Sequence, residues 1–407
     1  MKKRLLVILL LAAPSLRAAE IEFAESVPEE TVYGSTLAAR PARMWVEMIN
    51  GASKTLELEQ FYIADKPGEA LEPVLVAVRA AAARGVKVRI IVEKAMMKET
   101  SNALPGLTSE KNIEARIIEF KKIGGGIQHA KFIVADGREV FVGSQNFDWR
   151  ALSQIHEVGA LIKSERAARD FGAIFEADWA MAGGAEPRKA LGKTAKPLNA
   201  ADPETALVGG AAVKYRLAFS PVGLLPRGFD IEIKELLKLI KGARKTIHVQ
   251  VMNYSLFPYG KKNRWEELDN ALREAGKREV KVEIIFADWS MGGRDDKDIK
   301  SLSQAINVSV KIASFPVNSK GFVPFSRVDH SKYIVVDGEK AMLSTSNWSP
   351  DYFTATRGAA LIVEGAAGAA PLEDIFARAW NGPYVTPVDP AKKYTPVRKT
   401  KKEPASF

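Results

Sequence analysis

The chain has 407 residues, which is long enough for two compact domains, and its 46% apolar and 27% charged residues are typical of a soluble globular protein. It contains no cysteine, which excludes disulfides, a thiolate nucleophile and any Cys-ligated metal. The formal net charge of +10 is concentrated at the ends: the first 17 residues carry four positive charges and the last 16 a net five, which leaves about +1 for the body. Global charge therefore does not indicate the substrate.

The chain begins with a leader-like segment. Lys2-Lys3-Arg4 precedes a short apolar run from Leu5 to Ala13, and small residues follow at Ala18 and Ala19. This pattern predicts a cleaved signal peptide over residues 1–18. The alternative is a membrane anchor, but the run is shorter than the roughly 20 residues that a spanning helix needs. We therefore expect a periplasmic or secreted protein, and the lack of cysteine favours a bacterial periplasm.

The body of the chain repeats itself. Residues 51–58 resemble 242–249, residues 86–92 resemble 280–286, and His129-Ala130-Lys131 resembles His330-Ser331-Lys332. Strand-like and helix-like segments alternate in both copies, which predicts an α/β fold. We expect two similar α-β-α sandwich lobes, related by a pseudo-twofold axis, with the active site at their interface. The predicted boundaries are 19–182 and 213–386 for the lobes, 183–212 for an interdomain linker and 387–407 for a basic tail.

Each copy contains a predicted hairpin with the pattern His-x-Lys-x4-Asp-Gly, at residues 129–137 and 330–338. Side chains alternate along a strand, so each motif histidine shares a face with the motif lysine. Asp136 and Asp337 have the opposite parity and fall in the turns, which predicts a structural role. On the returning strands, the candidate phosphate-binding residues that share a face are Ser144, Asn146, Thr345 and Asn347.

This set of residues suits phosphodiester cleavage. Lysines and asparagines supply positive charge and hydrogen-bond donors for anionic oxygens without a metal or other cofactor. A neutral imidazole can attack phosphorus, while a protonated one gives its proton to the leaving oxygen. We therefore expect a bell-shaped dependence of the rate on pH. The chain has two further histidines, His156 and His248, for which a structural role is expected.

The paired motifs resemble those of the phospholipase D superfamily. The resemblance implies a phosphohistidine nucleophile, an acid/base histidine, and phosphate binding by Lys131, Lys332, Asn146 and Asn347, with no metal. The family often places a carboxylate after the first motif to orient the nucleophile, and Glu157 occupies that place, whereas the second copy has Gly358. On this basis His129 is the expected nucleophile and His330 the expected acid/base.

Within the superfamily, residues 147–154, 324–330 and 346–353 resemble the lysosomal phospholipase-D-like 5′-exonucleases and the related poxvirus proteins. That branch implies cleavage of single-stranded nucleic acid, with lipid activity also associated. The absence of cysteine is a departure from the lysosomal enzymes. The retained motif aspartates distinguish the chain from the tyrosyl-DNA phosphodiesterase branch.

Three functions remain open at this level. The first is a nuclease on single-stranded DNA or RNA, the second a phospholipase D or cardiolipin-synthase-like phosphatidyl transferase, and the third a non-catalytic binding protein. Nothing indicates an obligatory protein partner. The basic tail is a candidate contact for nucleic acid or anionic lipid, with a solvated disordered tail as the commoner case. Aromatic residues near the motifs are candidates for base stacking or for core packing: Phe147, Trp149, Tyr254, Trp348, Tyr352 and Phe353.

Overall fold

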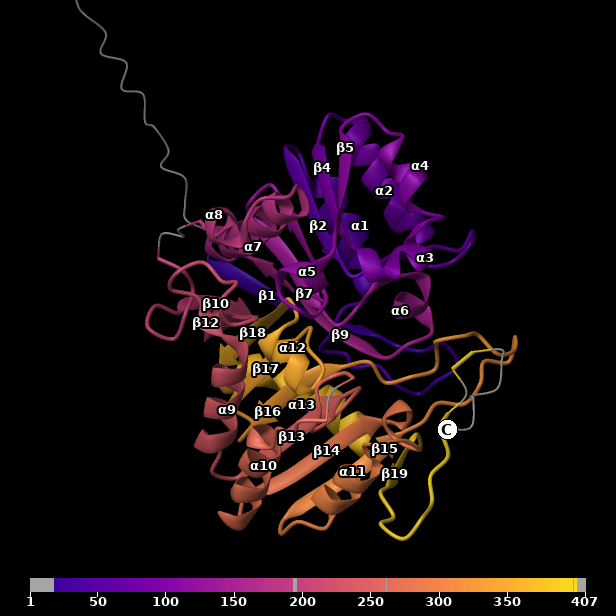
Figure 1. Cartoon of the computed structure of the whole chain (residues 1–407), viewed down its shortest axis with the longest axis vertical. Coiled ribbons are helices and arrows are strands. Elements are labelled where there is room, and N and C mark those ends of the chain that lie inside the picture. Colours follow the sequence, from indigo (N-terminus) through magenta and orange to yellow (C-terminus); the bar gives the residue numbers. More distant parts are fainter. Residues whose placement is uncertain (1–17, 193–195, 261, 398, 401–407) are drawn as a thin grey trace, which may run out of the picture.

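The computed structural model describes residues 18–192, 196–260, 262–397 and 399–400. The predicted signal peptide lies outside the described residues, apart from Ala18. Within the described part of the chain, none of the helices has both the length and the apolar character needed to cross a membrane. Two α/β lobes follow one another along the chain, as predicted, and Figure 1 shows the first (indigo to magenta) above the second (orange).

The first lobe contains the main strands β1 (Ala19–Ser26), β2 (Thr55–Gln60), β4 (Lys87–Glu93), β5 (Ile113–Ile118), β6 (Phe132–Ala135), β7 (Glu139–Gly143) and β9 (Glu157–Lys163). Its larger helices are α1 (Pro41–Gly51), α2 (Glu72–Ala83) and α7 (Glu165–Ala182). The short elements are β3 (Ile63–Ala64), η1 (Lys94–Met96), α3 (Met97–Thr100), α4 (Leu104–Thr108), α5 (Phe120–Ile123), β8 (Phe147–Asp148) and α6 (Trp149–Ser153).

The second lobe repeats this order with β11 (Ala211–Ser220), β13 (Thr246–Val251), β14 (Lys281–Ala287), β15 (Val308–Ala313), β16 (Lys332–Val336), β17 (Lys340–Ser344), β18 (Gly358–Glu364) and β19 (Val385–Pro387). Its larger helices are α9 (Glu232–Gly242), α10 (Glu267–Lys277), α11 (Asp296–Ser303) and α13 (Ala366–Trp380). The short elements are β12 (Asp230–Ile231), η2 (Asp288–Ser290) and α12 (Pro350–Thr354).

The main strands of both lobes belong to one continuous sheet. Its order is β5-β4-β2-β6-β7-β9-β1-β10-β11-β18-β17-β16-β13-β14-β15-β19. In each lobe three parallel strands adjoin the antiparallel hairpin that carries the His-x-Lys motif. Such mixed α/β sheets place functional groups beyond the carboxyl ends of the parallel strands.

The segment expected as a linker contains part of this sheet. After α8 (Pro187–Ala190), β10 (Glu204–Val208) runs parallel to β1 and antiparallel to β11, and so joins the two halves of the sheet. The tail also differs from the expectation of a free segment. Val388 donates a backbone hydrogen bond to Val310, and Lys300 Nζ donates to the Lys392 carbonyl at 2.6 Å. Residues 388–397 therefore pack along the second lobe.

Helix amphipathicity explains the layers. α9 buries Leu236, Leu237 and Ile240, and places glutamates in its first turn and Lys241 in its last turn, where each complements the helix dipole. α1 and α2 cover the first lobe, and α9, α10 and α11 cover the second, each with a core of its own. A third core contains residues of α7 and α13 together, so the two lobes share a buried apolar centre.

The lobes also exchange backbone hydrogen bonds at the start of both motifs. His330 N donates to the His156 carbonyl at 2.8 Å and His156 N donates to Val328 at 3.1 Å. In the equivalent place of the other copy, His129 N donates to the Arg357 carbonyl at 3.1 Å and Arg357 N donates to Ile127 at 2.9 Å. Each motif histidine is therefore fixed by a strand of the opposite lobe.

A buried ion pair reinforces each of these crossings. The His156 ring lies 3.0 Å from Glu25 and 3.4 Å from Asp329, and all three side chains are buried. Burial disfavours a charged imidazole, but Asp329 and Glu25 outweigh it and raise the pKa of His156 to about 10. At the other crossing, Arg357 pairs with buried Asp178 at 2.7 Å. His156 is thus structural, as is His248, which lies between Glu373 and Glu283 and stacks on Phe376.

We predict that the stability contributed by the His156 ion pair is lost at alkaline pH. Because the folded pKa of about 10 lies above the ordinary value of 6.5, its contribution is complete below pH 6.5 and is lost as pH rises through 10. Between these values the free energy of unfolding should fall by about 1.4 kcal/mol per pH unit more steeply than in H156Q. Urea unfolding of both proteins from pH 6 to 10 measures this, and parallel curves would contradict it.

Candidate active site

The two Asp-Gly turns are as predicted. Asp136 and Asp337 adopt positive φ angles of 53° and 56°, and the glycines that follow have φ values of 62° and 66°. Asp136 accepts hydrogen bonds from the backbone N–H groups of Ser53, Lys54 and Thr55, and Asp337 accepts from the equivalent residues 244–246. Although partial burial opposes it, these donors lower the pKa of Asp136 to about 2. The aspartates tie each hairpin to the start of β2 or β13.

His129 lies at the lobe interface, with only 3% of its surface exposed. Its Nδ1 is 3.0 Å from the carbonyl oxygen of Thr345, which belongs to the other lobe. The ring centroids of Phe61 and Tyr352 each lie 4.9 Å from the imidazole centroid. Burial lowers the pKa of His129 well below its usual value, and the nearby charges of Lys131, Lys332 and His330 lower it further. The Thr345 carbonyl and the Tyr352 ring belong to the second lobe, so His129 contacts residues of both lobes.

His330, which is 9% exposed, has a different partner. Its Nδ1 lies 2.7 Å from Glu157 Oε2, and Glu157 is fully buried. The expectation that Glu157 orients His129 is therefore wrong. The physical reason is the crossing of the lobes: His156 pairs with Asp329, so the next residue of each strand, Glu157 and His330, meet across the interface.

The motif lysines are held by the backbone of the motif histidines. Lys131 Nζ donates to the His129 carbonyl and Lys332 Nζ donates to the His330 carbonyl, each at 2.6 Å. Burial lowers the pKa of both ammonium groups, in the case of Lys332 to about 7, although Glu157 opposes the change. A bound phosphate would supply the missing negative charge and favour the charged lysines. The protein's own carboxylates supply too little negative charge to balance the two lysines.

The predicted asparagines and hydroxyls differ in their partners. Asn146 and Asn347 are buried, and neither Oδ1 atom has a hydrogen-bond partner among the described residues. Ser144 Oγ exchanges hydrogen bonds with the backbone of Val158, and Thr345 Oγ1 accepts from Ala359 N. The prediction that these hydroxyls bind phosphate assumes that side chains keep alternating beyond β7 and β17. The chain turns at the ends of these strands, so the alternation does not continue. These hydroxyls instead fix the ends of β9 and β18.

The aromatic candidates separate into two groups. Tyr352 borders His129, whereas five rings pack in the lobe cores: Phe147, Trp149, Tyr254, Trp348 and Phe353. Phe61, the other ring beside His129, was not predicted from the sequence. Its place directly after β2, at the carboxyl end of a parallel strand, is the signal that would have indicated it.

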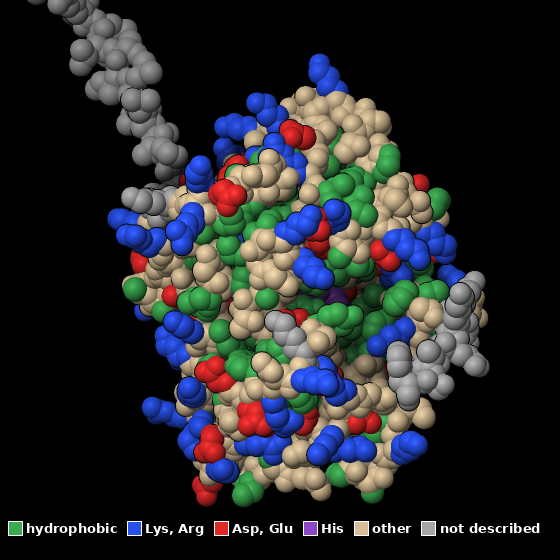
Figure 2. All heavy atoms as spheres, in the orientation of Figure 1, with side chains coloured by type: hydrophobic (Ala, Val, Ile, Leu, Met, Phe, Trp, Pro, Cys, Tyr) green, Lys and Arg blue, Asp and Glu red, His purple; other side chains and the backbone are tan. Residues whose placement is uncertain are grey.

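His330 remains 9% exposed, so the site is reached from the surface. Figure 2 shows a histidine side chain at the base of a depression in the middle of the molecule, with hydrophobic side chains around it. Within the described residues there is no cluster of three or more His, Cys, Asp or Glu side chains with the arrangement of a metal site. The groups that interact here are two imidazoles, two ammonium groups and one carboxylate, and the buried Asn146 and Asn347 follow the same two hairpins in the chain.

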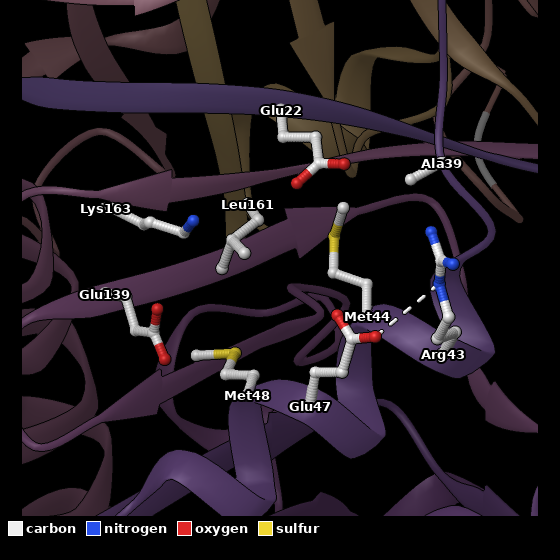
Figure 3. Close-up of a pocket in the computed structure, with 9 residues that line it drawn as sticks. All are labelled: Glu22, Ala39, Arg43, Met44, Glu47, Met48, Glu139, Leu161 and Lys163. Carbon is white, nitrogen blue, oxygen red and sulfur yellow. Dashed lines mark ion pairs between the residues drawn. The ribbon is translucent and has the colours of Figure 1, made fainter. Parts of the chain in front are cut away.

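A separate pocket of about 190 Å³ lies in the first lobe between α1 and strands β1, β7 and β9 (Figure 3). Its charged groups include Arg43 and Glu47, which form an ion pair at 3.6 Å, and Lys163, which lies 3.4 Å from Glu20. None of the motif residues lines it. This pocket is therefore distinct from the candidate active site.

Comparisons with known proteins agree with this geometry. The family model described as "Cardiolipin synthase, PLD-like domain" matches residues 45–179 and 236–380, one segment in each lobe. The 5′-3′ exonuclease PLD3 of Bos taurus is 31% identical, over 93% of this chain and 83% of that protein. The 5′-3′ exonuclease PLD4 of Mus musculus is 30% identical, over 90% and 79% of the two chains.

A Caenorhabditis elegans protein named probable phospholipase D F09G2.8 is 30% identical, over 84% of this chain and 66% of that protein. Among solved structures, phosphatidylserine synthase from Haemophilus influenzae Rd KW20 shares the fold with a TM-score of 0.62 and 12% identity, over 91% of this chain and 87% of that chain. The family model and the relatives together place the chain in the phospholipase D superfamily, in the branch of the lysosomal 5′-3′ exonucleases, as a phosphodiesterase.

Proposed function

We propose that this phosphodiesterase cleaves single-stranded DNA or RNA without a metal, through a phosphohistidine on His330 and with His129 as acid and base. The observation that carries the proposal is the 2.7 Å contact between His330 Nδ1 and Glu157, beside which the motif lysines donate hydrogen bonds to the backbone carbonyls of both motif histidines. Lys131, Lys332, Asn146 and Asn347 would bind the phosphate oxygens. The lysines and amides would stabilise the charge that develops on those oxygens.

The carboxylate decides the division of roles. A proton on His330 Nδ1 donated to Glu157 leaves the Nε2 lone pair free for attack, and the carboxylate stabilises the positive ring that results. Burial raises the pKa of Glu157, but Lys332, Ser144 and Lys131 oppose the rise, and phosphorylation of His330 would further favour the anion. The sequence pattern assigns Glu157 to His129 and so makes His129 the nucleophile. The contact of Glu157 with His330 reverses the roles of the two histidines.

His129 has the properties of the acid/base partner. A proton on its Nδ1 would be donated to the Thr345 carbonyl, and a second proton on Nε2 could then go to the leaving oxygen. The rings of Phe61 and Tyr352 flank the imidazole, and an anionic phosphate offsets the repulsion by the lysines.

In the first step the bond from phosphorus to the leaving oxygen breaks as the bond to His330 Nε2 forms, with the His129 proton going to that oxygen. In the second step, His129 takes a proton from water, whose oxygen attacks phosphorus and releases His330. Both histidines are needed in each turnover, in opposite protonation states at the start.

Two relatives named 5′-3′ exonucleases support a nucleic-acid substrate. The second candidate is phospholipid hydrolysis or phosphatidyl transfer, which is favoured by the relative named probable phospholipase D and by the family description. The complete pair of His-x-Lys motifs argues against a non-catalytic binding protein. The leader-like start supports export to a periplasm or out of the cell as a further part of the proposal.

We predict that phosphate is trapped on His330. With a p-nitrophenyl diester, whose leaving group needs little protonation, H129A should still form the intermediate but hydrolyse it slowly, whereas H330A should form none. Quenching in alkaline SDS after mixing with ³²P-labelled substrate, followed by peptide mapping at alkaline pH, locates the label, because phosphohistidine is stable to base and labile to acid. A label on His129 would reverse the roles of the two histidines.

We predict that E157Q lowers kcat by about 10²- to 10⁴-fold, because the ring of His330 loses its charged partner while its position is kept. The matched control is E47Q, which removes an exposed carboxylate paired with Arg43, and should retain full activity. Steady-state rates and melting temperatures of both variants separate catalysis from folding. Unchanged kcat in a folded E157Q would exclude Glu157 from the mechanism.

We predict that 5′-labelled single-stranded DNA is cleaved at the same rate with and without EDTA, because lysines and amides compensate the phosphate charge. Vesicles of phosphatidylglycerol or phosphatidylcholine serve as the competing substrate, with ethanol added to detect transfer. Lipid turnover without nucleotide release would reject the nuclease and establish the second candidate. Loss of all turnover with EDTA would reject a metal-free mechanism.

A further inference from the structure

The loop over residues 314–329 connects β15 to His330 and crosses from the second lobe onto the first. Arg327 Nη1 donates to the Glu29 carbonyl at 2.7 Å, and Ser319 N donates to Glu30 Oε2 at 2.8 Å. From the first lobe, Arg150 Nη1 donates to the Pro324 carbonyl at 3.0 Å. The loop is therefore held at both ends, in a fixed position beside the active site.

Phe325 in this loop has an unfavourable backbone. Its φ is 55°, in the left-handed region that bulky residues avoid, and Arg327 also has a φ of 55°. Phe325 is the only aromatic residue among the described non-glycine residues with positive φ. Its side chain nevertheless remains 47% exposed, so burial in the core does not compensate for the strain. Strain that presents a side chain to solvent indicates a functional role.

Phe325 belongs to a small group of exposed and half-buried side chains, which we call the ledge: Phe325, Trp289 and Lys399. The Phe325 and Trp289 rings lie 6.3 Å apart at an angle of 72°. Lys399 Nζ lies 5.0 Å from the Trp289 centroid, and the Lys399 carbonyl accepts from Phe325 N at 2.9 Å. The charge of Lys399 is partly balanced by buried Asp288, which also accepts from Ser314 Oγ.

The ledge adjoins the segments that carry the catalytic residues. Trp289 packs in a small cluster with Ile155, Val328 and Met252. Ile155 lies two residues before Glu157, and Val328 lies two residues before His330. Met252 N donates to the Ser331 carbonyl at 3.1 Å. A nucleotide next to the scissile phosphate would therefore come within reach of these rings.

We propose that the ledge binds a base of a single-stranded nucleic acid, one or two nucleotides from the scissile phosphate. Phe325 stacks on the base, Trp289 supports Phe325 from the side, and Lys399 contacts a backbone phosphate. Aromatic rings beside a cation form the usual platform for single strands, since every base offers a π face. This inference rests on the proposed nuclease function and names the contact that would hold its polymeric substrate.

The test compares F325A with V317A, a matched change of another exposed apolar residue in the same loop. Two substrates are used: a dT12 oligonucleotide and bis(p-nitrophenyl) phosphate, which has no base. For dT12 we expect F325A to raise KM about tenfold with kcat within twofold, and F325W to restore it. V317A should match the wild type, and turnover of the p-nitrophenyl ester should change less than twofold in every variant.

The outcomes distinguish the two proposals. If the wild type does not cleave dT12, the proposed function fails. If the wild type cleaves dT12 and F325A has the same KM, the proposed role of the ledge in binding a base is wrong. It is also wrong if F325A impairs only the hydrolysis of vesicles. Should F325A unfold, F325L keeps the apolar bulk without the aromatic ring, and the same rise in KM is expected. Binding of dT12 to H330A and to H330A/F325A, measured by fluorescence anisotropy, should show the same tenfold difference without turnover.

Discussion

The backbone crossing between the lobes is the constraint on which the active site depends. Residues 328–330 pair with His156, residues 127–129 pair with Arg357, and each crossing has a buried cation beside a carboxylate. A buried ion pair with one partner removed leaves an uncompensated charge, which is costly. The crossings therefore resist separation of the lobes and set the relative positions of groups that are about 200 residues apart in sequence.

The two copies of the lobe place their motif histidines in different surroundings. Glu157 meets His330, but the equivalent residue in the second copy is Gly358, and His129 Nδ1 instead lies beside the Thr345 carbonyl. A side chain at 358 has no room: its Cβ would lie 2.4 Å from Ser346 Oγ and 2.6 Å from Ser220 Oγ. The buried carboxylate of Glu232 fills the space nearby. This packing makes the site asymmetric, in keeping with the proposed division between a nucleophile and an acid/base.

The charge balance of the site points the same way. Burial lowers the pKa values of His129, His330, Lys131 and Lys332 together, and Glu157 is the single carboxylate that contacts a motif histidine among the described residues. Burying like charges with few counterions is unfavourable, so the protein alone favours neutral bases in this site. A phosphodiester anion relieves this repulsion. The site is thus organised for a bound phosphodiester, whose negative charge favours the charged form of both lysines.

Local patterns in the sequence determined the α/β lobes, the duplicated hairpins, the structural Asp136 and Asp337, and the shared face of each His and Lys. These features follow from side-chain periodicity and turn chemistry within about ten residues, which a sequence displays directly. The partner of Glu157, the hydroxyl contacts of Ser144 and Thr345, the strand inside residues 183–212 and the packed tail were decided only by the tertiary structure. The reason is that each depends on which lobe a segment meets after the chain folds, and pairing across the interface leaves no periodic signal in the sequence.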